Sequence, residues 1–140
     1  MDILRRNTDY ALRMMLNLAM RWEEGLISTR AVSKKMDIPY HLACKLMQKL
    51  NKAHLIESNL GPNGGFKLKK APSMINLLEI IEAIQGPMSL NRCLVDVSAC
   101  VRQCDCPVNK ELAGLQEYLV TFLSDITLDR LLSSNESDQT

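Results

Sequence analysis

The chain has 140 residues, 46% of them hydrophobic, which is enough for one compact domain, or a domain with an assembly element, but not for two full domains. No stretch approaches the roughly 20 apolar residues of a membrane-spanning helix, and the opening residues carry no apolar run of the signal-peptide kind, so we expect a cytoplasmic protein without a membrane partner. The net charge of +1 divides unevenly, with 13 Lys and Arg against 6 Asp and Glu in residues 1–70 and 4 against 10 in residues 71–140, and the basic half suits a polyanion.

Two helices are predicted at the start of the basic half. Apolar residues at helical spacing place the first over residues 8–22, with Thr8 as a possible N-cap. Ser28 is expected to cap the second helix, which runs to about Lys35. Its inward-facing residues are expected to be Ala31, Val32 and Met36.

A third helix is predicted over residues 39–53, with Pro39 in its first turn. Its buried face is expected to consist of Leu42, Ala43, Leu46, Met47 and Leu50. Its outward face carries residue types that contact phosphates and base edges, namely Tyr40, His41, Cys44, Lys45, Gln48 and Lys49. A short helix, a tight turn and a helix with a basic outer face form the helix-turn-helix pattern, whose second helix lies in the major groove of DNA. The alternative is an ordinary lysine-rich surface helix.

Two short strands are predicted next, over residues 55–58 and 66–70, joined by the turn-rich loop 59–65 whose glycines permit positive φ. A β-hairpin directly after a recognition helix is the wing of a winged helix. The expected wing contacts with DNA are Asn63, Gly64 and Lys67, and the phosphate backbone is expected to run along Lys67, Lys69 and Lys70.

The acidic half begins with a fourth helix, which Ser73 is expected to cap and Gly86 to end. Pro107 opens a long helix that is predicted to extend to about Leu132. Apolar residues spaced by four and three form a heptad seam along it: Val108, Leu112, Leu115, Leu119, Phe122 and Ile126. Such a seam favours packing on a second copy of the chain, although packing back on the first helix is an alternative. Residues 133–140 are expected to form a polar, frayed tail.

Four of the five cysteines lie between the fourth helix and the long helix, as Cys93, Cys100, Cys104 and Cys106. Clustered thiols in a reducing compartment are more often metal ligands or redox groups than disulfides. Cys100 and Cys104 have the spacing of one zinc knuckle, but Cys93 and Cys106 do not make a second, whereas iron–sulphur clusters accept looser spacings. The spacing alone leaves an iron–sulphur cluster, a structural zinc and a thiol switch open.

The residue types disfavour an enzyme. The only histidines, His41 and His54, belong to the predicted DNA-facing module, and the chain has no Cys-x-x-Cys pair. We therefore expect a binding protein without a catalytic site.

Four groups of residues together resemble a known family. They are the run TDYALR at 8–13, the run GPNGGF at 61–66 with Leu68, Pro72 and Ile75, the triplet Cys93, Cys100 and Cys106, and the closing Phe122, Leu123, Thr127, Leu128 and Leu131. They resemble the Rrf2 family of bacterial winged-helix transcription regulators over nearly the whole chain. Leu60 stands where many members have an arginine, and Cys44 where some have a glutamate, so the resemblance implies a different operator sequence.

The resemblance implies an iron–sulphur cluster, 2Fe-2S or 4Fe-4S, ligated by Cys93, Cys100 and Cys106. The fourth ligand in the family is either a residue shortly after the last cysteine or an acidic residue of the partner's first helix. Asn109 stands where some members have a histidine, which leaves Asp9 and the extra Cys104 as candidates. Cys106 is favoured over Cys104 because it directly precedes a helix start, where the helix dipole stabilises a thiolate.

The expected fold is mainly α with a small β-hairpin: a winged helix-turn-helix followed by a long C-terminal dimerisation helix. The expected parts are a DNA-binding domain (1–86), a cysteine-rich cluster-binding loop (87–106), the dimerisation helix (107–132) and the tail (133–140). We expect a homodimer that binds a double-stranded DNA operator and senses iron, redox state or nitric oxide through the cluster. The alternative is a zinc-stabilised or thiol-based redox regulator.

Overall fold

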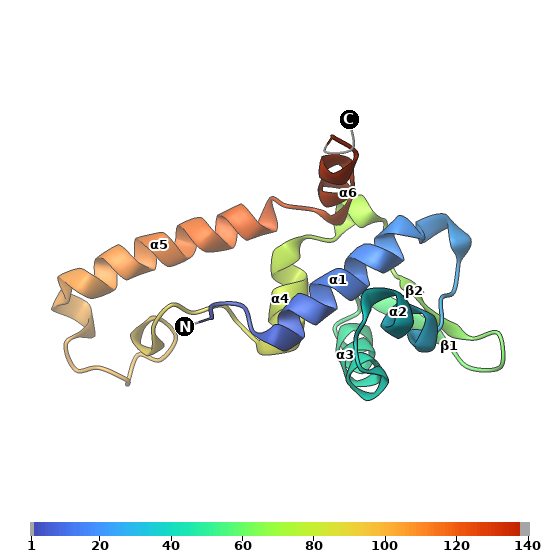
Figure 1. The fold of residues 1–140 in the computed structure, drawn as a ribbon. Helices are drawn as coiled ribbons and strands as arrows, with labels where there is room; N and C mark the ends of the chain where they lie inside the picture. Colours follow the sequence, from blue (N-terminus) through green and yellow to red (C-terminus); the bar gives the residue numbers. More distant parts are fainter. Residues whose placement is uncertain (1, 138–140) are drawn as a thin grey trace.

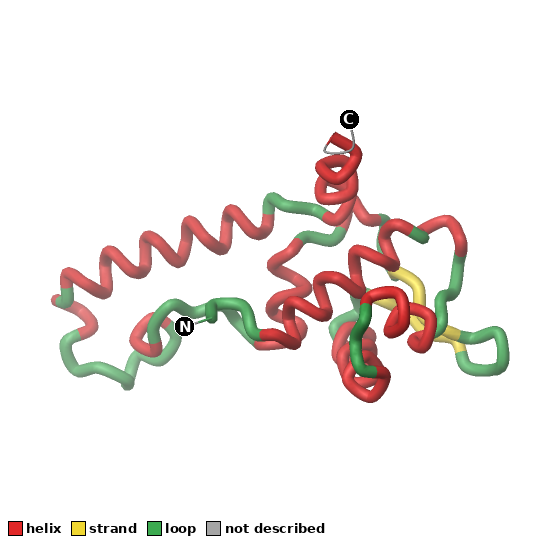
Figure 2. Tube along the Cα trace, viewed as in Figure 1, coloured by secondary structure: helices red, strands yellow, loops and turns green. Residues whose placement is uncertain are grey.

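The structure, a computed structural model, describes residues 2–137 and consists of a globular part with one projecting helix (Figure 1). Its helices and strands are α1 (Arg6–Met20), α2 (Thr29–Met36), α3 (Tyr40–Lys52), β1 (Ile56–Asn59), β2 (Gly65–Leu68), α4 (Leu77–Gln85), α5 (Pro107–Ser124) and α6 (Leu128–Ser137). Short 3-10 turns cover Trp22–Glu24, Pro72–Met74, Arg92–Leu94 and Gln103–Asp105. Figure 2 shows how little of the chain is strand, so the prediction of a mainly helical fold with one small hairpin is confirmed.

The core of the globular part lies between α1, α3, α4 and α6. Its largest fully buried side chains are Met14, Met15, Leu18, Leu46, Met47, Leu50, Ile56, Leu68, Ile75, Ile80, Ile81 and Leu128. Burying a side chain of this size contributes about 1.5–3 kcal/mol. Because Leu128 belongs to this set, the C-terminal helix is part of the same core as α1 to α4.

The helix-turn-helix follows the predicted pattern, with small differences. Ser28 caps α2 as expected, since its Oγ accepts a hydrogen bond from the Ala31 amide at 3.1 Å. Ala31 itself is exposed rather than inward-facing, and Ser33 is buried instead, where its hydroxyl donates to the Ile38 carbonyl at 2.6 Å. Pro39 is the N-cap of α3 rather than its first helical residue. The hydrogen bond from Ser33 to Ile38 fixes the turn between α2 and α3.

Two helix starts differ from the prediction. Thr8 is not an N-cap: it lies inside α1, fully buried, and its hydroxyl donates to Gln85 Oε1 at 2.7 Å. Ser73 does not cap α4 either, because it lies in a preceding 3-10 turn and Asn76 is the cap. The Thr8 contact with Gln85 is distant in the chain, whereas the Asn76 cap is a local capping box with Glu79 three residues later.

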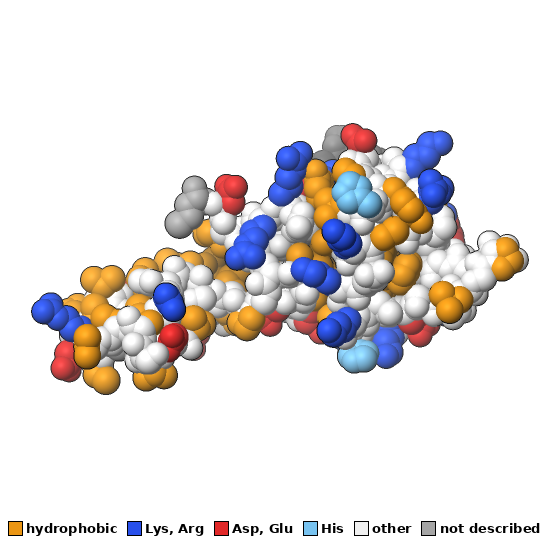
Figure 3. All heavy atoms as spheres, turned by 90° about the horizontal axis from the view of Figure 1, so that it is seen from below, with side chains coloured by type: hydrophobic (Ala, Val, Ile, Leu, Met, Phe, Trp, Pro, Cys, Tyr) orange, Lys and Arg blue, Asp and Glu red, His pale blue; other side chains and the backbone are white. Residues whose placement is uncertain are grey.

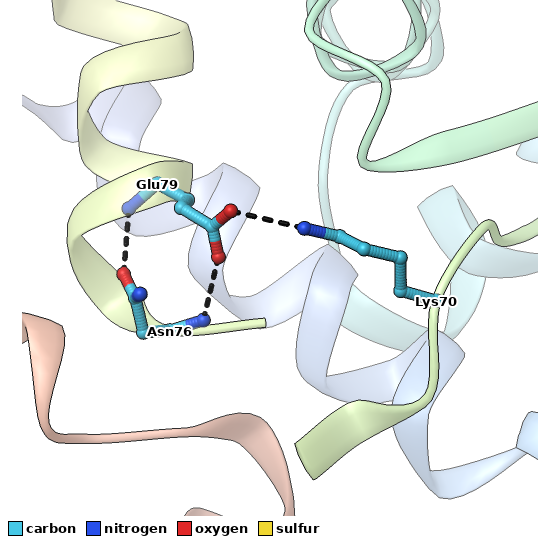
Figure 4. Close-up of polar contacts among 3 residues, drawn as sticks. All are labelled: Lys70, Asn76 and Glu79. Atoms are coloured by element: carbon cyan, nitrogen blue, oxygen red, sulfur yellow. Dashed lines mark hydrogen bonds and ion pairs between the residues drawn. The ribbon is translucent and has the colours of Figure 1, made fainter. Parts of the chain in front are cut away.

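The start of α4 is held by a capping box (Figure 4). Asn76 Oδ1 accepts from the Glu79 amide at 3.0 Å, and Glu79 Oε2 accepts from the Asn76 amide at 3.0 Å. The ammonium group of Lys70 lies 3.0 Å from the other carboxylate oxygen of Glu79. The end of the hairpin is thereby tied to the first turn of α4.

The single helix predicted over residues 107–132 is two helices in the structure. The chain breaks between Ser124 and Leu128, where the Leu77 amide donates to the Ile126 carbonyl at 2.9 Å and the Leu128 amide donates to the Ile75 carbonyl at 3.0 Å. After the break α6 packs on α1, whereas α5 extends away from the globular part (Figure 1). Residues 133–137, predicted as part of a frayed tail, continue α6, and residues 138–140 lie outside the described residues.

Candidate nucleic-acid interface and cysteine segment

The outer face of α3 carries the residues that were predicted to meet DNA. Tyr40, His41, Lys45, Gln48 and Lys49 are exposed, while Cys44 is half-buried. The opposite face is buried in the core at Ala43, Leu46, Met47 and Leu50. Figure 3 views the protein from below Figure 1, the side on which α3 lies, and shows Lys and Arg side chains spread over the globular part there.

The hairpin forms a short wing next to this face. β1 and β2 pair antiparallel, with Ile56 opposite Leu68 and Asn59 opposite Gly65, and residues 60–64 form the loop at the tip. Asn63 is exposed at this tip. Gly64 is required here because a Cβ would clash with the Asn59 carbonyl oxygen, and its amide donates to the Gly61 carbonyl at 3.0 Å.

Two of the wing lysines have partners within the chain. Lys67 Nζ lies 3.2 Å from Glu57 Oε1 on the neighbouring strand, and this pair is partly exposed. Lys70 is engaged with Glu79 at the start of α4. Of the three lysines predicted along the phosphate backbone, Lys70 therefore has a structural partner, and Lys69 is exposed.

One basic residue that the sequence did not single out lies beside α3. Arg30, on α2, places its guanidinium carbon 4.3 Å from the centre of the Tyr40 ring. Both residues line a cleft of about 440 Å³ that also includes Ser28 and the hairpin residues Asn59 and Gly64. An arginine over an aromatic face is a cation–π pair. No spacing rule links two residues ten positions apart across a turn, so the sequence offers no signal for this pair.

The wing is fixed against the start of α2. The Ile27 amide donates to the Phe66 carbonyl at 2.9 Å, and the Phe66 amide donates to the Ile27 carbonyl at 2.8 Å. A Cβ at Gly65 would clash with the Ile27 carbonyl, so the close approach of the two segments requires this glycine. The cleft between α2, α3 and the wing is therefore built from three elements held in fixed relation.

The cysteine segment joins α4 to α5, and its two ends differ from its middle. Cys93 is half-buried in the Arg92–Leu94 turn, and its Sγ accepts a hydrogen bond from Asn109 Nδ2 at 3.3 Å. Cys106 is the N-cap of α5 and is also half-buried. Because Asn109 lies in the first turn of α5, this hydrogen bond holds Cys93 close to the N-terminus of that helix, where Cys106 is the N-cap.

The middle of the segment is exposed. Cys100 and Cys104 are both exposed, and no described cysteine forms a disulfide. Local hydrogen bonds shape this stretch: the hydroxyl and the amide of Ser98 donate to Asp96 Oδ1 at 2.6 and 2.9 Å, and they lower the pKa of Asp96 below its usual value.

Asp9 lies on α1, whereas the four clustered cysteines lie between α4 and α5. It is exposed in the first turn of α1, where its Oδ2 lies 3.5 Å from Arg13 Nε. Among the described residues, no three His, Cys, Asp or Glu side chains are grouped closely enough to hold a metal ion. The fold therefore brings Cys93 to the α5 start but does not gather the predicted ligands into one group.

No helix within residues 2–137 is both long and apolar enough to cross a membrane.

Comparison with known proteins assigns nearly the whole chain to one family. Residues 4–134 match the family model described as Rrf2, iron-dependent transcriptional regulator. The transcriptional regulator NsrR of Halalkalibacterium halodurans is 32% identical over 136 residues, which cover 94% of this chain and 91% of that protein. The regulator IscR of Klebsiella pneumoniae is 31% identical over 127 residues, which cover 91% of this chain and 77% of that protein.

Solved structures show the same fold. The cysteine regulator CymR of B. subtilis is 27% identical, with a TM-score of 0.79 over 96% of this chain and 98% of that one. IscR of T. potens has a TM-score of 0.77 at 22% identity, covering 98% of this chain and 90% of that one. The family model matches residues 4–134, and the relatives are transcriptional regulators, so the chain belongs to the Rrf2 family of DNA-binding transcriptional regulators.

Proposed function

We propose that this protein is a homodimeric, cytoplasmic transcription regulator whose affinity for its DNA operator depends on an iron–sulphur cluster held by the cysteine segment. The observation that carries the proposal is the position of Cys93 and Cys106 at the start of α5. Cys93 is docked on the first turn of that helix by Asn109, and Cys106 begins it. The cysteine segment thus connects the DNA-binding part to the projecting helix.

The DNA-binding role uses α3 and the wing. The exposed Lys45, Gln48 and Lys49 face would enter the major groove, with Tyr40 and His41 at its start and Asn63, Gly64 and Lys67 on the wing. On DNA binding, Lys67 would lose part of its interaction with Glu57 and gain a contact with a phosphate group. Cys44, half-buried on the same helix, would contact DNA only at its exposed edge.

Dimerisation through α5 is supported by the surface of that helix. None of its residues is buried, although it carries the large apolar side chains Val108, Leu115, Tyr118 and Phe122, all exposed. Leaving such side chains in water forgoes about 1.5–3 kcal/mol each. A second copy of α5 presents the same stripe, and a self-complementary stripe is what a two-fold dimer requires.

The cluster proposal rests on the donor set. Cys93, Cys100 and Cys106 offer thiolates, the ligands that iron–sulphur clusters use, and the start of α5 favours the thiolate form of Cys106. Cys104 is exposed and adjacent, and the exposed Asp9 could be supplied by the partner subunit. When bound, the cluster would supply iron–thiolate bonds that respond to oxidation, nitric oxide or loss of iron. The exposed middle of the segment leaves room for Cys100 to approach the α5 start.

The link to DNA is positional. Residues 87–106 leave the end of α4, which packs on α1 and α3, and enter α5. A change in ligation would alter how α5 of one subunit is held relative to its DNA-binding part, and so the spacing of the two recognition helices. Coupling of about 1–3 kcal/mol is typical and changes affinity about 5-fold to 150-fold.

The decisive experiment is anaerobic purification followed by iron, sulphide and zinc analysis and operator binding at fixed salt. We expect iron and sulphide with little zinc, and different affinities for the holo and cluster-free forms. Stoichiometric zinc without sulphide would favour the zinc-stabilised alternative. Equal affinities of the two forms would make the cysteines structural. An Asp9→Ala variant that keeps its cluster would remove only the partner-subunit ligand.

A further inference from the structure

The strongest unassigned surface lies on the side of the globular part away from α3. A groove of about 700 Å³ runs between the end of α1, the Trp22–Glu24 turn, the Pro72–Met74 turn and α6. Figure 1 shows α6 and the recognition helix on opposite sides of the globular part. The groove would therefore stay open while α3 occupies DNA.

Half of the residues that line the groove are apolar, and two of these are large and exposed. Ala19, Pro72 and Leu132 line it together with Met20 and Trp22, which are 62% and 40% exposed. Trp22 is the only tryptophan of the chain. Tryptophan is the aromatic residue most often found in energetically important contacts between proteins, and methionine adapts its shape to different partners. Leaving both side chains exposed to water is energetically unfavourable for the isolated chain.

The charged residues that line the groove are acidic. Glu23, Glu24 and Asp129 line it, and no Lys or Arg does so among the described residues. Glu24 is already ion-paired with Arg21, whereas no ion pair to Glu23 or Asp129 occurs within residues 2–137. This acidic groove, formed by residues of α1, two 3-10 turns and α6, contrasts with the basic α3 side of the globular part.

We propose that this groove, formed by Met20, Trp22, Glu23, Leu132 and Asp129, docks a short segment of a partner protein in which an apolar side chain is flanked by Lys or Arg. The apolar side chain would pack on Met20 and Leu132. A cationic neighbour would lie over the exposed face of Trp22, where a cation–π contact adds to its attraction to Glu23 and Asp129. The charge pattern excludes DNA as the occupant because both would be negative.

Trp22 provides the readout, since binding in the groove must change its fluorescence. The probe is an acetylated Lys-Leu-Lys-Leu-Lys peptide added to the full-length protein without DNA, which the basic peptide would otherwise bind. We expect a saturable fluorescence change. A Glu-Leu-Glu-Leu-Glu peptide and a Lys-Gly-Lys-Gly-Lys peptide should give none, because each lacks one of the two required features.

Matched variants separate the groove from net charge. Glu23→Gln with Asp129→Asn should weaken the peptide affinity about tenfold. Glu111→Gln with Glu117→Gln removes the same two charges from α5 and should leave the affinity unchanged. Met20→Ala should weaken it about threefold to tenfold through lost apolar contact, and it provides a second test if Asp129→Asn disturbs α6.

The outcomes that would overturn the proposal are distinct. No saturable change with the Lys-Leu peptide, or equal affinity in the groove and α5 variants, would remove the docking site. In the Leu115→Asp, Phe122→Asp variant, whose α5 stripe carries two charges, a Trp22 signal that depends on protein concentration without peptide would show that a second copy occupies the groove instead. Because operator binding is measured separately, none of these results affects the proposed function.

Discussion

Arg30 and Tyr40 form a cation–π pair that joins α2 to the first turn of the recognition helix, with the guanidinium carbon 4.3 Å from the ring centre. The pair lines the cleft beside the wing, so a phosphate entering that cleft would meet an arginine whose plane is already oriented. Arginine binds phosphate through a planar fork that lysine cannot reproduce. The exposed face of α3 and this cleft therefore form one continuous candidate surface.

Replacing this arginine should weaken operator binding. We expect Arg30→Ala to reduce affinity about tenfold and to lower the salt slope by about one, because one phosphate contact is lost. The operator affinity of Arg30→Lys should lie between those of the unaltered protein and Arg30→Ala. Tyr40→Leu should also weaken binding, because Arg30 loses the ring that orients it. The measurement is fluorescence anisotropy with labelled operator over a salt series.

The matched control for Arg30 is another arginine on the opposite side of the module. Arg130→Ala removes the same charge from α6 and should leave operator affinity within about twofold, because a distant exposed charge is screened. If both variants weakened binding equally, the effect would be one of net charge and the cleft would have no specific role.

The apolar stripe of α5 should determine the oligomeric state. Leu115→Asp with Phe122→Asp places two charges in the proposed interface, where each would lose its hydration. Both positions are exposed in the single chain, so the fold of the subunit should survive. We expect monomers by sedimentation equilibrium, with unchanged helical content by circular dichroism. Glu117→Gln on the same helix is the control, and a double variant that stays dimeric would place the interface elsewhere.

Iron and sulphide analysis of single substitutions should distinguish the cysteines that bind the cluster from the one that does not. Single Cys93→Ser, Cys100→Ser and Cys106→Ser substitutions should each abolish the iron and sulphide of anaerobically purified protein, whereas Cys104→Ser should retain them. The reason is that Cys93, Cys100 and Cys106 match the triplet that the family resemblance implies, whereas Cys104 is an extra thiol. Cys106 also begins α5, and Cys93 is docked on its first turn. Retention in Cys106→Ser together with loss in Cys104→Ser would reverse this assignment.

The periodicity of the sequence predicted the helix-turn-helix well because its determinants are local. The alternation of buried and exposed residues on α3 needs only one helix and one core, and the serine cap of α2 lies three residues from the amide it accepts from. The largest failure, the end of the predicted long helix, involves contacts far apart in the chain. The heptad pattern continues through Ile126, but backbone bonds from residues 126–128 to residues 75–77 end the helix at Ser124.

The candidate site also has features that follow from local sequence and features that depend on tertiary structure. The outer face of α3 follows from its spacing, whereas the partner of Lys70 and the stacking of Arg30 on Tyr40 depend on tertiary structure. The density of the cysteines predicted a chemical role but left a cluster, a zinc site and a thiol switch open, and only the family resemblance implied Cys93, Cys100 and Cys106 as the ligand set. Among the described residues the fold of the single chain does not gather them into one group.

Gln85, the last residue of α4, connects the N-terminal segment to the point where the cysteine segment begins. Its Oε1 accepts from Thr8 Oγ1 at 2.7 Å, and its Nε2 donates to the Ile3 carbonyl at 3.1 Å. We expect Gln85→Ala to lower the free energy of unfolding by about 1–3 kcal/mol, because the buried Thr8 hydroxyl loses its acceptor. Urea denaturation measures this loss. Gln116→Ala, which removes a single acceptor for the Leu90 amide, is the control and should cost less.

The same variant tests whether the N-terminal segment takes part in sensing. Thr8 precedes Asp9, the proposed ligand from the partner subunit, so releasing Thr8 from Gln85 should loosen the position of that carboxylate. We expect Gln85→Ala protein to bind operator with near-normal affinity in its cluster-free form, since α3 and the wing are untouched. The ratio of holo to cluster-free affinities should move towards one. Anisotropy titrations of both forms at one salt concentration measure this ratio, and an unchanged ratio despite the lower stability would mean that Gln85 serves folding alone.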